Sequence, residues 1–213
     1  CWTNGITAGT SATTYGGDAS VTTAQAALML MKALGYFQYS NDFGSDWQLA
    51  TVSQGSKIGL FQDVKAAVTE AMTRNDVAQL VLNTLESGMV EPNKTGQDIT
   101  IGDITITNGV EYQYVTSTES YARAIDNARP QNTATSISTD GCIVELGEKL
   151  YDGDLRRTEN TEDAYGRPGT RWVYNLDEVG TYSDAPLATY TNKVTKGDLY
   201  SLVTKSRLDD IEK

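Results

Sequence analysis

Two stretches of this chain share one sequence pattern, and this repetition constrains the fold more than any other feature. SVTTAQAALMLMKAL occupies residues 20–34, and AMTRNDVAQLVLNTL occupies residues 71–85. In each, a threonine (Thr22 or Thr73) stands three residues before an amide or acid, which is the spacing of a capping box at a helix start. Apolar residues then recur at helical spacing. The offset of about 50 residues is in the range where an internal period indicates repeated supersecondary units.

The two copies differ directly after the threonine. The first copy has Thr23 where the second has Arg74, while Gln25 and Asp76 hold the matching position of the box. The shared threonine predicts the same helix start twice, so we expect any functional difference to lie at Arg74. The predicted buried stripes are, in the first copy, Ala26, Met29, Leu30, Ala33 and Leu34, and in the second, Val77, Leu80, Val81, Thr84 and Leu85.

A third helix is expected between the two copies, from Asp46 to Ile58, ending at Gly59 before an apolar residue. The first residues of the chain resemble that ending, because Gly5 is also followed by an apolar residue, Ile6. The unit is therefore a helix, a glycine turn, a loop and a capped helix. We expect the first copy to be clipped within its first helix.

Composition excludes several classes of function. The 213 residues contain no histidine, which removes Ser-His-Asp, Cys-His and histidine–zinc chemistry. The net charge of −11 argues against nucleic acid and anionic membranes as partners. No apolar run is long enough to span a membrane, and we expect no signal peptide. The expectation is a protein that is not an enzyme and holds no cofactor or metal.

The two cysteines, Cys1 and Cys142, form one disulfide or remain thiols; the sequence leaves both alternatives open. A cysteine in first position is typical of a lipoprotein, but we favour a cut within a longer chain.

The chain is expected to be α+β. Residues 1–90 are the helical part, with a partial repeat over 1–35 and a second repeat over 36–90. Residues 91–213 are a β-rich domain with a C-terminal helix. Its expected elements are a hairpin at Asn108-Gly109, a helix over 119–129, a strand over 141–146, an acidic turn region over 151–169, strands near 170–174, 180–182 and 188–191, and a helix from Thr195.

The repeat resembles the S-layer homology (SLH) domain. The first copy, WTNGITAGTSATTYGGDASVTTAQAALMLMKALGY, is similar to the family's G-I-x-x-G loop at Gly5, Ile6 and Gly9, followed by its helix start. The second copy, DWQLATVSQGSKIGLFQDVKAAVTEAMTRNDVAQLVLNTL, places Trp47 at the head of its first helix, as the family does.

The resemblance implies a cell-surface protein of a Gram-positive-type bacterium, anchored to the cell wall. SLH domains pack as helical clusters and bind pyruvylated secondary cell-wall polysaccharide. The family's arginine suits such a ligand, since its planar guanidinium matches a carboxylate. The polysaccharide site implied in this chain comprises Arg74, Trp47, Asp76 and Gly59.

Other readings stay open. The repeats could instead make subunit contacts in a surface lattice or filament, or the chain could be a carboxylate-based wall-glycan hydrolase. Arg74 could simply be a solvent-facing arginine that pairs with Asp76 or a neighbour. The acidic stretch could bind calcium or be a solvated turn. Cross-strand pairing explains the strand tyrosines, such as Tyr112 and Tyr114, and a carbohydrate-stacking surface is the alternative.

Overall fold

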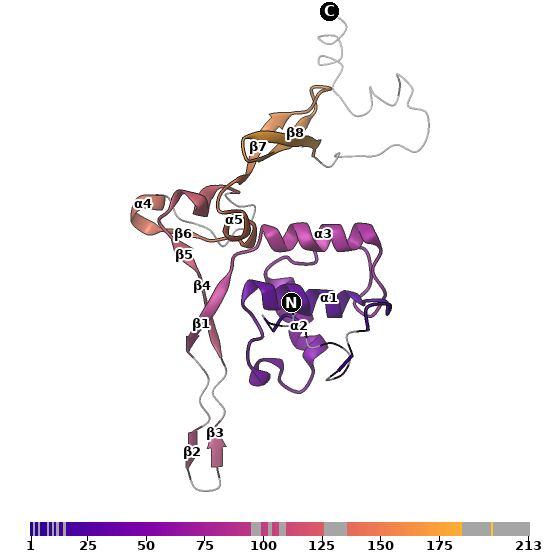
Figure 1. The fold of residues 1–213 in the computed structure, drawn as a ribbon, viewed down its shortest axis with the longest axis vertical. Coiled ribbons are helices and arrows are strands. Elements are labelled where there is room, and N and C mark those ends of the chain that lie inside the picture. The colour runs from indigo at the N-terminus through magenta and orange to yellow at the C-terminus, as the bar shows by residue number, and fades with distance from the viewer. Residues whose placement is uncertain are drawn as a thin grey trace, which may run out of the picture.

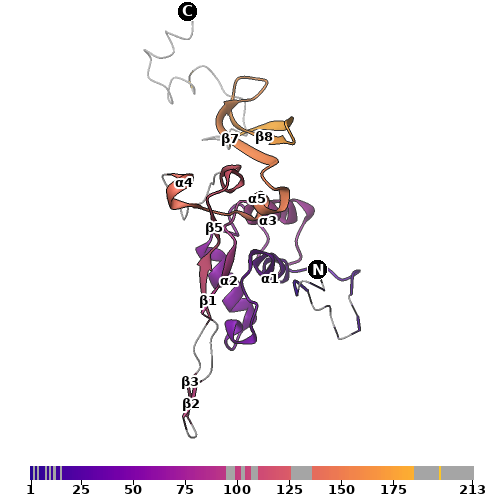
Figure 2. The same cartoon turned by 60° about the vertical axis from the view of Figure 1, so that its left-hand side comes forward.

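The computed structural model describes residues 1, 3, 5–7, 9, 11, 13–14, 16–94, 99–101, 104–106, 110–125, 136–184 and 197. Figures 1 and 2 show an elongated molecule with its helices gathered beside the middle. A two-stranded ribbon extends from this body at one end, and a three-stranded sheet lies at the other. The helices of the body are α1 (Thr23–Leu34), α2 (Trp47–Lys57) and α3 (Arg74–Leu85), with a short 3₁₀ turn, η1 (Ser40–Phe43), before α2.

The two predicted capping boxes are confirmed. The Thr22 hydroxyl accepts from the N–H of Gln25, whose side chain accepts in return from the N–H of Thr22. Thr73 and Asp76 make the same reciprocal pair at the start of α3. A cap of this kind contributes about 1 kcal/mol to helix stability. The helix predicted between them is also confirmed, with Asp46 capping the start of α2.

The segments that precede α1 and α3 pair with each other. Thr22 and Ala71 form an antiparallel bridge, and the N–H of Met72 donates to the carbonyl of Val21 at 3.2 Å. The N–H groups of Thr23 and Ala24 donate to the carbonyls of Glu70 and Val68 at 3.0 and 2.9 Å, in the order given. The starts of α1 and α3 therefore lie side by side.

The three glycine turns share one geometry. Gly5, Gly35 and Gly59 all have left-handed φ, of 68°, 107° and 70°. After each, the next N–H donates five residues back: Ile6 to Cys1, Tyr36 to Met31 and Leu60 to Gly55. This bond satisfies a carbonyl that the end of a helix leaves without an intrahelical partner. The predicted likeness between the Gly5 and Gly59 turns is confirmed.

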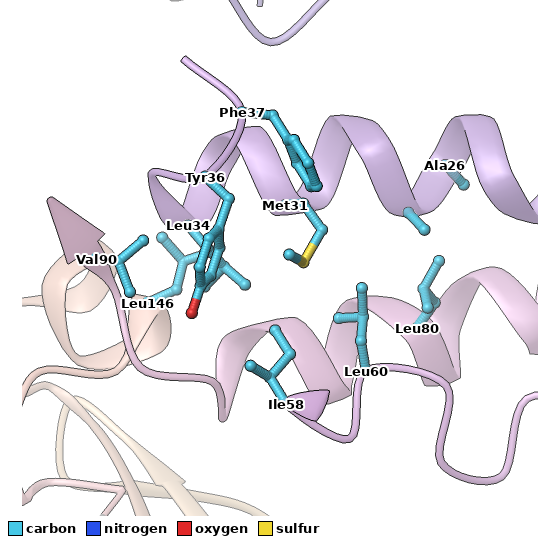
Figure 3. Packing of buried hydrophobic residues seen from close by; sticks show 11 residues of the cluster. Ala26, Met31, Leu34, Tyr36, Phe37, Ile58, Leu60, Leu80, Val90 and Leu146 are labelled. Carbon is cyan, nitrogen blue, oxygen red and sulfur yellow. The ribbon is translucent and has the colours of Figure 1, made fainter. Parts of the chain in front are cut away.

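The main core lies between the three helices and the base of the ribbon (Figure 3). The predicted stripe of α1 is confirmed at Ala26 and Leu34, whereas Met29, Leu30 and Ala33 are only half-buried. The other buried positions of α1 are Thr23, Ala24, Ala27 and Met31. Ile58, Leu60, Leu80, Val90 and Leu146 complete this core.

The predicted stripe of α3 is wrong in part. Leu80 and Thr84 are buried, but Val77 and Val81 are 44% and 38% exposed. The polar Asn83 is buried in their place. Its amide nitrogen donates to the carbonyls of Leu60 and Gln62, and this pins α3 to the turn that follows α2. Burial of an amide lowers stability when its hydrogen bonds are unmade, but here the Asn83 amide has partners, so its burial is tolerated.

The ribbon consists of two paired segments. In the first, β1 (Val90–Lys94) pairs with β4 (Glu111–Tyr114); in the second, β2 (Ile99–Ile101) pairs with β3 (Ile104–Ile106). Because Ile101 pairs with Ile104, the chain reverses between these two residues. The predicted hairpin at Asn108-Gly109 is wrong in its pairing: the turn itself lies outside the described residues, but the strands before and after it pair with β2 and β1 rather than with each other.

A small second cluster joins the ribbon to the C-terminal part. It lies around β5 (Thr116–Ser117), η2 (Ser120–Arg123), α4 (Ile137–Asp140) and β6 (Cys142–Ile143). The helix predicted over 119–129 is present only as η2 within the described residues. The strand predicted over 141–146 is shorter, because α5 (Leu146–Tyr151) begins there, where the Glu148 carboxylate accepts from the N–H of Glu145 at 2.9 Å.

The outer sheet is formed by β7 (Leu155–Glu162), β8 (Pro168–Tyr174) and β9 (Asp177–Ser183). The two strands predicted near 170–174 and 180–182 are confirmed. The acidic turn region is wrong over β7, whose charged side chains belong to an edge strand that is exposed to solvent. The strand predicted at 188–191 and the helix predicted from Thr195 lie outside the described residues, except for Gly197.

The α+β class is confirmed. The predicted boundary at residue 90 stays a prediction. Val90 and Leu146 belong to the same buried cluster as α1, and Tyr112 and Tyr114 pack against it, so core residues lie on both sides of that boundary.

Gly35 provides a test of this packing. A Cβ at Gly35 would collide with the carbonyl oxygen of Val90, whereas a Cβ at Gly44, which also has positive φ, would meet no atom within 4 Å. We expect Gly44→Ala to lower the free energy of unfolding by about 1–2 kcal/mol through backbone strain alone. Gly35→Ala should lower it by at least about 3 kcal/mol, since the clash adds to the strain. Urea denaturation measures both, and equal losses would contradict the contact between α1 and β1.

Candidate functional site

The start of α3 carries the arginine that the resemblance singles out. Thr73, Arg74 and Asn75 are all exposed, and we call these three residues the α3 start. Among the described residues, no ion pair or hydrogen bond is recorded for the Arg74 guanidinium. Its side chain is therefore exposed at the positive end of the helix dipole.

The carboxylate of Asp76 is occupied by the cap. One oxygen accepts from the N–H of Lys65 at 3.0 Å, and the other accepts from the hydroxyl of Thr73 at 2.6 Å and from its N–H at 3.3 Å. These bonds, the Thr73 hydroxyl first among them, hold the pKa of Asp76 below its ordinary value. The geometry assigns Asp76 a role in positioning the loop and helix, and it argues against the reading in which Asp76 pairs with Arg74.

The starts of α1 and α3 differ in what their first N–H groups do. At α1, the N–H groups of Thr23 and Ala24 already donate to the carbonyls of Glu70 and Val68. At α3, the structure records no acceptor within its described part for the N–H groups of Arg74 and Asn75. The first N–H groups of α1 are therefore already bonded to the loop that precedes α3, whereas those of α3 can donate to a ligand. We call the start of α1 closed and the start of α3 open.

Trp47 and Gly59 lie at opposite ends of α2. Trp47 is the first residue of α2, half-buried, and its carbonyl accepts from the hydroxyl of Thr51 at 2.7 Å. Gly59 forms the left-handed turn after α2. It is this end of α2 that approaches α3, at Asn83, which is far along α3 from Arg74. The four residues proposed for the site are therefore divided between two places.

The loop residues of the first copy have structural roles. Gly5 and Gly9 both have positive φ, and a Cβ at Gly9 would press against the carbonyl oxygen of Thr14. The ammonium of Lys32 donates to the carbonyl of Gly5 at 3.3 Å, and this ties the Gly5-Ile6 turn to the last turn of α1.

The two cysteines are not joined in the structure. Cys1 is exposed, whereas Cys142 is buried in the second cluster beside Ala122 and Val144.

A groove of about 600 Å³ lies between α2 and the ribbon, and sequence analysis did not predict it. We call it the tyrosine groove, because its aromatic lining is Tyr36, Phe37, Tyr112 and Tyr114. The Tyr36 and Tyr112 rings lie 5.4 Å apart between centroids. The only sequence signals were the alternation of Tyr112 and Tyr114 on a strand and the aromatic pair that follows Gly35.

The Tyr112 hydroxyl of the groove is held in place by two hydrogen bonds. The Tyr112 hydroxyl donates to Oδ2 of Asp42 at 2.5 Å and accepts from the N–H of Gln38 at 3.3 Å. Tyr36 is buried, and its ring packs against the ring of Tyr112. Burial, as the largest cause, raises the pKa of both phenols above the ordinary range, so they stay neutral.

Asp163, in the acidic stretch, is bound to the guanidinium of Arg167 at 2.6 and 2.7 Å, and this pairing lowers the pKa of the carboxyl. Within the described ranges, no group of three or more histidine, cysteine, aspartate or glutamate residues could hold a metal ion. None of the described helices has the length and apolarity needed to cross a membrane.

No family model matches the chain, and neither a curated protein nor a solved structure matches it significantly.

Proposed function

We propose that this chain is a non-enzymatic cell-surface protein that is held on the cell wall by an acidic polysaccharide bound at the α3 start. The observation that supports this most is the exposed Arg74 beside two N–H groups for which the described structure records no acceptor. A guanidinium and two backbone donors suit a ligand carboxylate such as that of a pyruvyl group.

The closed start of α1 strengthens the assignment to the second copy. Thr23 cannot supply a cation, and its N–H is already bound to Glu70. A chain with net charge −11 repels an acidic polymer at long range, so binding depends on this local donor set. We therefore expect one acidic-glycan site in the two copies.

Substitution of Arg74 tests the proposal. We expect Arg74→Ala to weaken binding to purified pyruvylated wall polysaccharide roughly ten- to hundred-fold, since a charge-assisted hydrogen bond contributes about 1.5–3 kcal/mol. Arg171→Ala, which removes the same charge from an exposed position on β8, is the matched control and should bind as the unaltered chain does. Co-sedimentation with the insoluble polymer measures both.

Three outcomes would count against this function. Equal binding of Arg74→Ala and Arg171→Ala would remove the α3 start as the site. Unchanged binding after mild acid strips the pyruvyl groups would remove the carboxylate as the recognised feature. No retention of the unaltered chain by the polymer would remove anchoring itself.

A second candidate function, contacts between copies in a surface lattice, is favoured by the exposed valines of α3. Val77 and Val81 lie one turn apart on the same helix face and are 44% and 38% exposed. We expect light scattering of a concentrated solution to give a mass above 23.1 kDa that falls to that value in Val77→Lys/Val81→Lys. A strictly monomeric chain at high concentration would exclude this candidate.

A further inference from the structure

The tyrosine groove has the dimensions of a binding site. Its volume of about 600 Å³ is in the range of small-molecule sites in proteins. The Tyr112 hydroxyl is bonded to Asp42 of η1 and to the N–H of Gln38, and the Tyr36 ring packs against the Tyr112 ring, so these two rings are already positioned. A ligand that binds here does not have to order these rings, which lowers the cost of binding.

The opposite wall of the groove is one face of α2. Its lining residues are Ala50, Ser53, Gln54 and Lys57, which recur at the spacing of a single helical stripe. This wall offers a hydroxyl, an amide and an ammonium to a ligand whose other side lies on tyrosine rings. Such a pairing of a flat apolar wall with a polar wall matches a sugar ring, which has apolar faces and hydroxyls around its edge.

The lining carries little charge, which disfavours strongly ionic ligands. The lining includes one carboxylate, on Asp42, whose Oδ2 already accepts from Tyr112 and from the N–H of Tyr39. It also includes one ammonium, on Lys57, at the exposed end of the α2 stripe. A polyanion would contact only one cationic side chain in this lining, that of Lys57. A cation would contact only the Asp42 carboxylate, which already accepts hydrogen bonds.

We propose that the tyrosine groove is a second glycan site and that it binds an uncharged saccharide. The rings of Tyr112 and Tyr114 stack on the sugar, while Ser53 and Gln54 bond its hydroxyls. The site shares no lining residue with the α3 start, so it does not depend on Arg74 or on the acidic polysaccharide.

Arginine at Ser53 tests this site without disturbing the core. Ser53 is an exposed position of α2 that lines the groove, and arginine there places a long side chain across it. Ser56→Arg is the matched control, since Ser56 is exposed on the same helix and does not line the groove. Arginine is a good helix former, so both variants should fold; thermal unfolding checks this.

The measurement begins with the full chain on an array of uncharged oligosaccharides, with uronic-acid and pyruvylated glycans as charged comparators. The best uncharged ligand is then titrated by calorimetry into three variants. We expect Ser53→Arg to weaken binding at least about tenfold, because it blocks stacking on the tyrosines. Ser56→Arg and Arg74→Ala should bind as the unaltered chain does.

Four results would overturn the proposal. Binding of charged glycans alone would show that the lining does not select an uncharged sugar. Equal affinity of Ser53→Arg and Ser56→Arg would place the saccharide elsewhere. Binding of library peptides that Ser53→Arg abolishes, with no saccharide bound, would assign the groove to a peptide. Loss of binding in Arg74→Ala but not in Ser53→Arg would leave only the α3 start as a glycan site.

Discussion

The backbone pairing between the segments that precede α1 and α3 is the interaction on which the body of this protein depends. It sets the two helix starts side by side, while the far end of α1 packs against β1 through Gly35 and Val90. The same pairing makes the two copies unequal. The carbonyls of Val68 and Glu70 close the start of α1, so only the start of α3 can present backbone donors outward.

The parts of this fold that follow from local bonding could be predicted from the sequence. Thr22 and Thr73 cap their helices, and Gly5 and Gly59 make the same turn, because the bonds involved connect residues at most five apart in the chain. The buried face of α3 could not be predicted, because Asn83 is stabilised there by carbonyls of a distant loop. The strand β7 was missed because its pairing with β8, rather than its charged residues, determines its structure.

The candidate site, too, could be predicted from the sequence only in part. Arg74 and its box were visible as a motif, and the structure supplies what the motif could not, namely that Asp76 is occupied and the neighbouring N–H groups are not bonded within the described residues. The tyrosine groove depends on long-range contacts between α2, η1 and β4, as in the bond from Tyr112 to Asp42. The outcome is two different donor sets, a cationic helix start and a nearly neutral aromatic groove, on one acidic chain.

Amide hydrogen exchange, followed residue by residue by nuclear magnetic resonance, tests most directly the claim that one helix start is closed and the other open. This arrangement should give strong protection of the amides of Thr23 and Ala24, which donate to Glu70 and Val68, and rapid exchange at Arg74 and Asn75. Equal protection of the two pairs would contradict it, because the α3 start would then have no donors to offer a ligand.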